Sequence, residues 1–191
     1  MRFVICDEES EYITNFYLQD IDKDLINHII ELINRSIYRY EKIYVATNLC
    51  KKNKINLLLS YCYLFQFERN LHKEQFYPIG NKLKYKLKIC KIENKFLKTL
   101  NKNLNNSHAP YLLGKYYYIK KDFINMKLCY KLGIKLKNYF CCFKMFEYYS
   151  FNSPFKPKIN KIIKYHHICN ELSLNSNYVY TWINAFKNFI I

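Results

Sequence analysis

The stretch that most constrains the fold is residues 107–149, where apolar side chains recur at helical spacing on both sides of one short interruption. The first apolar face consists of Ala109, Leu112, Leu113, Tyr116 and Tyr117. The second consists of Phe123, Met126, Tyr130, Gly133 and Ile134. Between them, Lys120 and Lys121 break the pattern and Asp122 is a good N-cap, while Pro110 suits a first helical turn. The spacing therefore predicts two helices that close against each other as a hairpin.

This hairpin resembles a known repeat. The matching positions are Leu113, Gly114, Tyr117, Asp122, Phe123, Met126, Tyr130 and Gly133, and they are similar to the tetratricopeptide repeat and the related Sel-like repeat. Met126 stands where a small residue is expected, and Asn138 where a proline is expected. A shift of 32 residues aligns Phe96 with Leu128, Leu100 with Leu132 and Ala109 with Cys141, which indicates further units. Repeats in chains rich in Lys, Asn, Ile and Tyr also look like those encoded by large DNA viruses. The resemblance implies stacked hairpins with a concave binding face.

The remaining patterns predict a mainly α protein in two parts. Three glycines and four prolines in 191 residues leave few helix breakers. Helices are expected at about 22–39 and 54–69, while 2–6, 42–47 and 82–89 have the composition or alternation of strands. Residues 1–90 are thus expected to form an N-terminal subdomain, either helical or small α+β. Residues 91–191 are expected to form the helical-repeat domain, ending in a helix pair at 158–172 and 177–190.

Charge is strongly asymmetric along the chain. The net charge is +16, yet residues 1–34 carry eight acids and two bases, which leaves the other 157 residues at +22. A basic body favours acidic partners or polyanions. Lysine-rich surfaces are also typical of chains from AT-rich genomes, so this pattern alone does not select a partner.

Catalytic, metal-binding and membrane signals are weak. The chain holds no nucleophile elbow, phosphate-binding loop, dinucleotide fingerprint or zinc-protease motif, so we do not expect an enzyme or a cofactor. Eight cysteines form no C-x-x-C pair. His166 and Cys169, with Cys129 or Cys141, are the best metal ligands, and without a second close pair we expect no metal. No apolar run reaches about 20 residues, and the first residues do not look like a signal peptide. We expect an intracellular, cytoplasmic protein in a reducing compartment.

Two binding functions follow from these patterns, and they use different residues. The first is a non-enzymatic interaction scaffold whose groove binds an acidic partner segment through Lys115, Tyr118, Lys144 and Tyr148. The alternative is a non-specific nucleic-acid-binding protein. It would use a ridge of lysines, in particular Lys84, Lys86, Lys88, Lys120, Lys121, Lys127 and Lys131, and the absence of arginine after Arg69 argues against base recognition. A structural subunit of a larger assembly is a third possibility.

Overall fold

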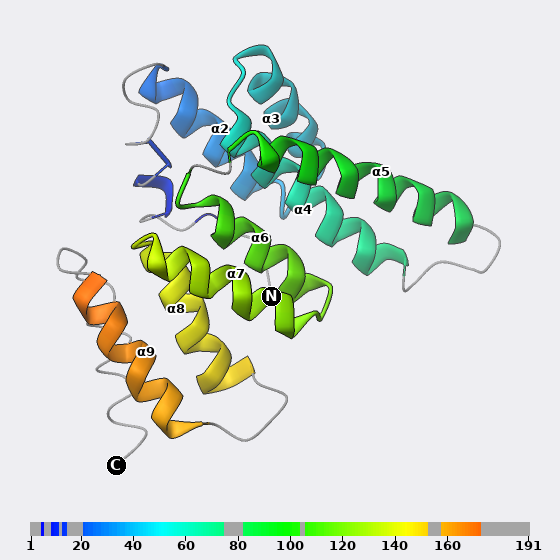
Figure 1. Ribbon diagram of the computed structural model, residues 1–191. Coiled ribbons are helices and arrows are strands. Elements are labelled where there is room, and N and C mark those ends of the chain that lie inside the picture. The colour runs from blue at the N-terminus through cyan, green and yellow to red at the C-terminus, as the bar shows by residue number, and fades with distance from the viewer. Residues whose placement is uncertain are drawn as a thin grey trace. The chain divides into compact units, whose positions relative to one another are not determined.

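The computed structural model describes residues 5, 9–11, 13–14, 21–74, 82–103, 106–152 and 158–172 (Figure 1). Within these residues every element of regular structure is a helix, which confirms the mainly α fold expected from the sequence. The chain divides into two compact units, residues 1–104 and residues 105–191. Each unit is described by itself.

The first unit is organised around one buried helix. Its described helices are α2 (Lys23–Arg35), α3 (Glu41–Lys52), α4 (Asn56–Glu74) and α5 (Lys82–Asn101). Consecutive helices pack against each other, and α2 also contacts α4. Residues 57–67 of α4 are all buried. A helix that is buried on every side is surrounded by other elements, so α4 forms the centre of this unit.

Helix α2 is amphipathic, as its apolar spacing predicts. Asp22 caps its N-terminus by accepting a hydrogen bond from the backbone N–H of Asp24 at 3.0 Å. Its buried side chains are Ile26, Ile29, Ile30, Leu32 and Ile33. The helix ends at Arg35, earlier than predicted, because residues 36–38 form a turn whose backbone bonds back to the last helical carbonyls.

Part of the acidic N-terminal stretch packs into the first unit. Glu9 is buried, and its carboxylate accepts a hydrogen bond from the hydroxyl of Tyr61 on α4. The side-chain amide of Asn34 donates to the carbonyl of Ile5 at 3.0 Å and accepts from its N–H at 2.9 Å. A buried carboxylate needs such a partner, so Glu9 anchors this stretch to α4.

Two predicted strands are helices in the structure. Residues 42–47 lie in α3, where Ile43, Ala46, Thr47 and Cys50 are buried at helical spacing. The β-branched content of this stretch suggested a strand, but side-chain packing decides such short segments. Residues 82–89 begin α5, so their alternation of lysine and apolar residues is also not a strand. The α+β alternative is wrong at both places, and most of 2–6 lies outside the described residues.

The predicted domain boundary falls inside a helix. Residues 90 and 91 lie in the middle of α5, whose inner face buries Ile89, Ile92, Phe96 and Leu100. Helix α5 packs against α4 along this face. The first compact unit therefore keeps the whole of α5 and extends to Leu104.

The second unit contains the predicted hairpin and the helices that follow it. Its described elements are α6 (Ala109–Ile119), α7 (Phe123–Lys135), α8 (Tyr139–Glu147), the π-helical turn η2 (Tyr148–Asn152) and α9 (Ile159–Leu172). Helices α6 and α7 pack on each other, α8 packs on both, and α9 packs on α8 and η2 (Figure 1). The last predicted helix, 177–190, lies outside the described residues.

The same tight turn recurs at both helix connections of residues 109–147. At the first, the N–H of Asp122 bonds to the carbonyl of Tyr117 at 2.9 Å, and Lys121 has a φ of 60°. At the second, the N–H of Asn138 bonds to the carbonyl of Gly133 at 2.9 Å, and Lys137 has a φ of 58°. This is the Schellman pattern of helix ends, here with lysine in the left-handed position. Asp122 and Asn138 then cap α7 and α8, accepting from the N–H groups of residues 125 and 141, each at 3.1 Å.

Two glycines allow the three helices to approach closely. A Cβ on Gly114 would lie 2.2 Å from a ring carbon of Tyr130, so α6 and α7 touch at this point. A Cβ on Gly133 would lie 2.1 Å from Sγ of Cys141, so α7 and α8 touch there. Ala109, Leu112, Tyr116, Met126 and Tyr130 are buried as predicted, whereas Leu113 and Tyr117 are only half-buried.

Candidate partner-binding surface

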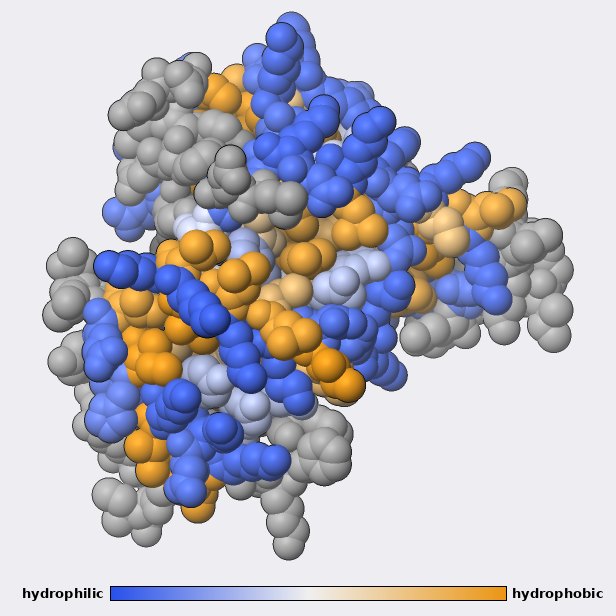
Figure 2. Space-filling view, in the orientation of Figure 1, coloured by the Kyte–Doolittle hydropathy of each residue, from blue (hydrophilic) through white to orange (hydrophobic). Residues whose placement is uncertain are grey.

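The outer face of α7 carries four exposed aliphatic side chains in a line. Ile124 is 71% exposed, Leu128 58%, Leu132 53% and Leu136, just after the helix, 46%. They recur every fourth residue and therefore lie along one side of the helix. We call these four residues the α7 stripe. Figure 2 shows apolar side chains running along α7 with hydrophilic side chains beside them.

The α7 stripe lies opposite the buried face of the same helix. Met126, Tyr130 and Gly133 pack inward against α6 and α8, and the stripe faces outward. Isolated exposed leucines are ordinary, but a continuous apolar line along a whole helix is typical of a surface that another element covers. The alignment at a shift of 32 residues placed Leu128 and Leu132 with Phe96 and Leu100. Phe96 and Leu100 are buried on α5 whereas Leu128 and Leu132 are exposed on α7, so the aligned positions differ in burial.

Positive charge flanks the α7 stripe along one side and at both ends. From residue 120 to residue 137 the chain has six lysines and one acid, a net charge of +5. The lysines are Lys120, Lys121, Lys127, Lys131, Lys135 and Lys137, and all except the half-buried Lys127 are exposed. The acid, Asp122, caps α7, and its hydrogen bonds from Asn125 lower its pKa, so that it stays ionised. The stripe is thus an apolar line in a basic field.

The four residues predicted to bind a partner are found in two different settings. Tyr118, Lys144 and Tyr148 lie near one another where α6, α7 and α8 meet, because Tyr118 and Tyr148 both pack on Phe123, with ring centroids 6.1 Å and 5.7 Å away. Lys144 forms an ion pair with Glu147 at 2.6 Å. Lys115 lies elsewhere on α6, with its Nζ 4.6 Å from the ring centroid of Tyr111.

Exposure limits what these four residues offer to a partner. Tyr148 is only 4% exposed, so its predicted place on an open face is wrong. It is buried because it continues the inward face of α8, three residues after the buried Met145, and packs on Phe123. Burial, and then the charge of Glu147, raise the pKa of Tyr118. Tyr118 and Lys144 are half-buried and already hold intramolecular partners.

The predicted nucleic-acid residues are divided between the two units. Lys86 and Lys88 are exposed on α5, and Lys84 is a residue of that helix. Lys120, Lys121, Lys127 and Lys131 belong to α7 and the turn before it. The predicted residues thus form two sets of lysines, one on each unit.

Cysteine and histidine do not assemble a metal site in the described part of the chain, where no cluster of three or more metal-ligating side chains occurs. Cys169 on α9 instead faces Cys142 on α8, with 3.0 Å between their sulfur atoms. His166 packs its ring against Phe146. Cys141 lies against Gly133, on the side of α8 that faces α7.

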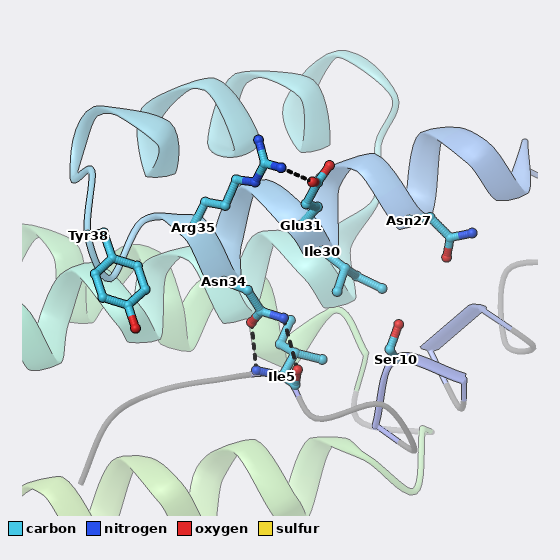
Figure 3. Close-up of a pocket in the computed structure, with 8 residues that line it drawn as sticks. All are labelled: Ile5, Ser10, Asn27, Ile30, Glu31, Asn34, Arg35 and Tyr38. Atoms are coloured by element: carbon cyan, nitrogen blue, oxygen red, sulfur yellow. Dashed lines mark hydrogen bonds and ion pairs between the residues drawn. The ribbon is translucent and has the colours of Figure 1, made fainter.

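The first unit has an open cavity of about 480 Å³ beside α2 (Figure 3). It is lined by Ile5, Ser10, Asn27, Ile30, Glu31, Asn34, Arg35 and Tyr38. Figure 3 shows the amide of Asn34 turned toward the backbone of Ile5 and the guanidinium of Arg35 turned toward Glu31, an exposed ion pair at 2.6 Å. Asn34 thus holds Ile5 on α2, whereas the ion pair of Glu31 and Arg35 lies within α2 itself.

Comparison with known protein families, curated proteins and solved structures found no match for this chain. Among the described helices, none combines the length and the apolar character needed to cross a lipid bilayer.

The sequence contains a signal for the α7 stripe that helical-repeat matching obscures. Residues 123–136 place apolar side chains on two opposite faces, one with Met126 and Tyr130 and one with Leu128 and Leu132. A helix with two apolar faces needs cover on both sides. The repeat match used only the first face.

Proposed function

We propose that this protein is a non-enzymatic interaction scaffold, or adaptor, that binds an acidic amphipathic segment of a partner protein. The observation that carries this proposal is the α7 stripe, four exposed aliphatic side chains along one helix in a field of lysines. Side-by-side pairing of two amphipathic helices uses this kind of surface, with apolar anchors for affinity and flanking charges for orientation.

Charge selects the partner's chemistry. The eighteen residues around the stripe carry +5, so a second copy of this chain would bring like charges together at the contact. Glutamate and aspartate beside an apolar seam would instead meet Lys131 and Lys135 along one side of the stripe and Lys121 at its N-terminal end. An acidic partner segment therefore fits this surface better than self-association does.

The length of the stripe sets the size of the segment. Ile124 to Leu136 spans twelve residues, or roughly 18 Å along a helix axis. A partner helix of about four turns covers this length, with apolar residues three or four positions apart facing the stripe.

The test compares two peptides of about four helical turns with the same leucine seam. One peptide has glutamates beside the seam and the other has lysines. We expect the full-length protein to bind the glutamate peptide and not the lysine peptide. Leu128→Asp with Leu132→Asp should weaken that binding by roughly 10-fold or more, because it removes two anchors and adds negative charge. Fluorescence anisotropy with labelled peptides gives the affinities.

Leu87 provides a matched control for this experiment. It is a leucine of similar exposure, 57%, on α5 of the other unit. Leu87→Asp should leave the peptide affinity unchanged, and circular dichroism should show that all variants are folded. Equal binding of both peptides, or equal loss with Leu87→Asp, would contradict the proposal. Photo-crosslinking from position 128 in cells would then identify the natural partner, whose contact segment should be acidic and amphipathic.

A further inference from the structure

Five lysines of the first unit lie on one face of a single helix. Lys88, Lys91, Lys95 and Lys98 on α5 and Lys102 just after it are separated alternately by three and four residues. This spacing keeps them on one side of the helix over roughly 21 Å. All five are exposed, and we call them the α5 lysine face.

The core of the first unit holds this face in place. Ile89, Ile92, Phe96 and Leu100 are buried on the adjacent side of α5, against α4. The helix cannot rotate about its axis without exposing these four side chains to water. The lysine side chains therefore extend from a rigid helix in a fixed order, which lowers the entropic cost of contacting a long ligand.

The positive charge of this face is not neutralised within the described part of the chain. None of the five lysines forms an ion pair there. Glu93, the one acid of α5, lies two positions from both Lys91 and Lys95 and so points to a different side of the helix. The net charge of α5 itself is therefore positive from its second turn to its end.

We propose that the α5 lysine face binds the phosphate backbone of nucleic acid. Its five positions contain only lysine, with no apolar side chain to anchor a protein segment or enter a membrane, unlike the α7 stripe. Lysine ammonium groups contact phosphates as point charges and do not read bases in the bidentate way that arginine does. Binding should be independent of sequence and strongly dependent on salt.

The site acts independently of the proposed protein contact. The α5 lysine face belongs to the first unit and the α7 stripe to the second. A protein with both surfaces would attach an acidic partner to a nucleic acid. Nucleic-acid binding by the α5 lysine face does not require the α7 stripe.

The test uses the full-length protein, a labelled oligouridine RNA and a labelled DNA duplex, each titrated at several salt concentrations. Lys91→Gln with Lys95→Gln should weaken binding by roughly 10-fold at low salt. It should also reduce the slope of log affinity against log salt by about 1.5, since each lost phosphate contact removes about 0.7–0.9. RNA and duplex that respond alike would show that the shared backbone is the ligand, and a response confined to one would identify that source.

Lys51→Gln with Lys52→Gln is the matched control. It removes the same charge from exposed lysines at the end of α3 in the same unit. Its affinity and salt slope should stay close to those of the unmodified protein. An equal loss in both variants would overturn the inference, because net charge and not the α5 lysine face would then govern binding. Absence of salt-dependent binding would also overturn it. The inference would also be overturned if the protein bound polyglutamate more tightly than RNA or DNA and the Lys91 and Lys95 substitutions abolished that binding. The α5 lysine face would then bind an acidic protein.

Discussion

At the scale of single residues, the second unit depends on positions where any side chain larger than that of glycine would clash with a neighbouring helix. Gly114 lies against the ring of Tyr130, and Gly133 lies against Cys141. The resemblance to the repeat singled out Gly114, Tyr130 and Gly133. Sequence did not reveal what each glycine would touch, because that depends on how closely the helices approach. Tyr148 differs, because its helical spacing from the buried Cys141 and Met145 does indicate an inward position, which the groove prediction did not use.

Gly114→Ala should destabilise the protein by about 1–2 kcal/mol. Overpacking at the Tyr130 ring costs about 1–3 kcal/mol, and the better helix propensity of alanine offsets part of it. In a Tyr130→Leu background the same substitution should cost less, because the ring that it meets is gone. Urea unfolding of the two single variants and the double variant measures this coupling. An equal cost in both backgrounds would show that Gly114 and Tyr130 do not constrain each other.

The thiol of Cys129 on α7 should react slowly at neutral pH. Burial, and then the charge of Asp122, raise the pKa of Cys129 from 9.0 to about 11. Only the thiolate reacts, so at pH 8 the alkylation rate should be roughly 100-fold below that of a thiol with the ordinary pKa. The rate should rise about tenfold per pH unit and level off near pH 11.

Mass spectrometry of iodoacetamide-treated protein resolves Cys129 from the other cysteines, and the same protein in urea provides the reference rate. Unfolding should remove the difference because it removes both causes of the raised pKa. A native rate that levels off near pH 9 would contradict the assignment.

At the scale of elements, apolar spacing located most described helices. The predicted helices at 22–39, 54–69 and 158–172 correspond to α2, α4 and α9 with shifted ends. The two strand predictions failed: β-branched composition suggested a strand at 42–47, and alternation of lysine with apolar residues suggested one at 82–89, but both segments are helical. In α5, Leu87 would share a strand face with Ile89, but in the helix Ile89 is buried and Leu87 is exposed. One exposed leucine costs little, whereas an unpaired strand would leave its backbone hydrogen bonds unmade.

Binding surfaces were harder to predict than helices because they depend on which face a neighbour covers. Residues 123–136 and residues 88–102 both carry regular patterns, one of aliphatic side chains and one of lysines. Sequence alone does not show that α4 covers the apolar side of α5 while the leucines of α7 stay exposed. Of the groove residues predicted from the repeat resemblance, Tyr118 packs on Phe123, Lys144 pairs with Glu147, and Lys115 lies over the ring of Tyr111.

At the scale of the whole molecule, the chain consists of two units with separate cores. The first is built around α4 and the second around the contacts of α6, α7 and α8. The division at residues 104 and 105 follows the end of α5. The sequence predicted this division fourteen residues too early. The change from alternating to helical spacing near residue 90 suggested the start of a new domain, whereas it lies within one continuous helix.

Fragments cut at these two positions should behave differently. We expect fragments 1–104 and 105–191 each to be helical and to unfold cooperatively, since each retains its own core. A cut between residues 90 and 91 separates Ile92, Phe96 and Leu100 from α4, and each of these side chains contributes roughly 1.5–3 kcal/mol on burial. That loss is comparable to the total stability of a small domain, so fragment 1–90 should be largely unfolded. Circular dichroism melts of fragments 1–104, 105–191, 1–90 and 91–191 measure their stability. A cooperative melt for fragment 1–90, together with an unfolded fragment 1–104, would show that α5 does not belong to the first core.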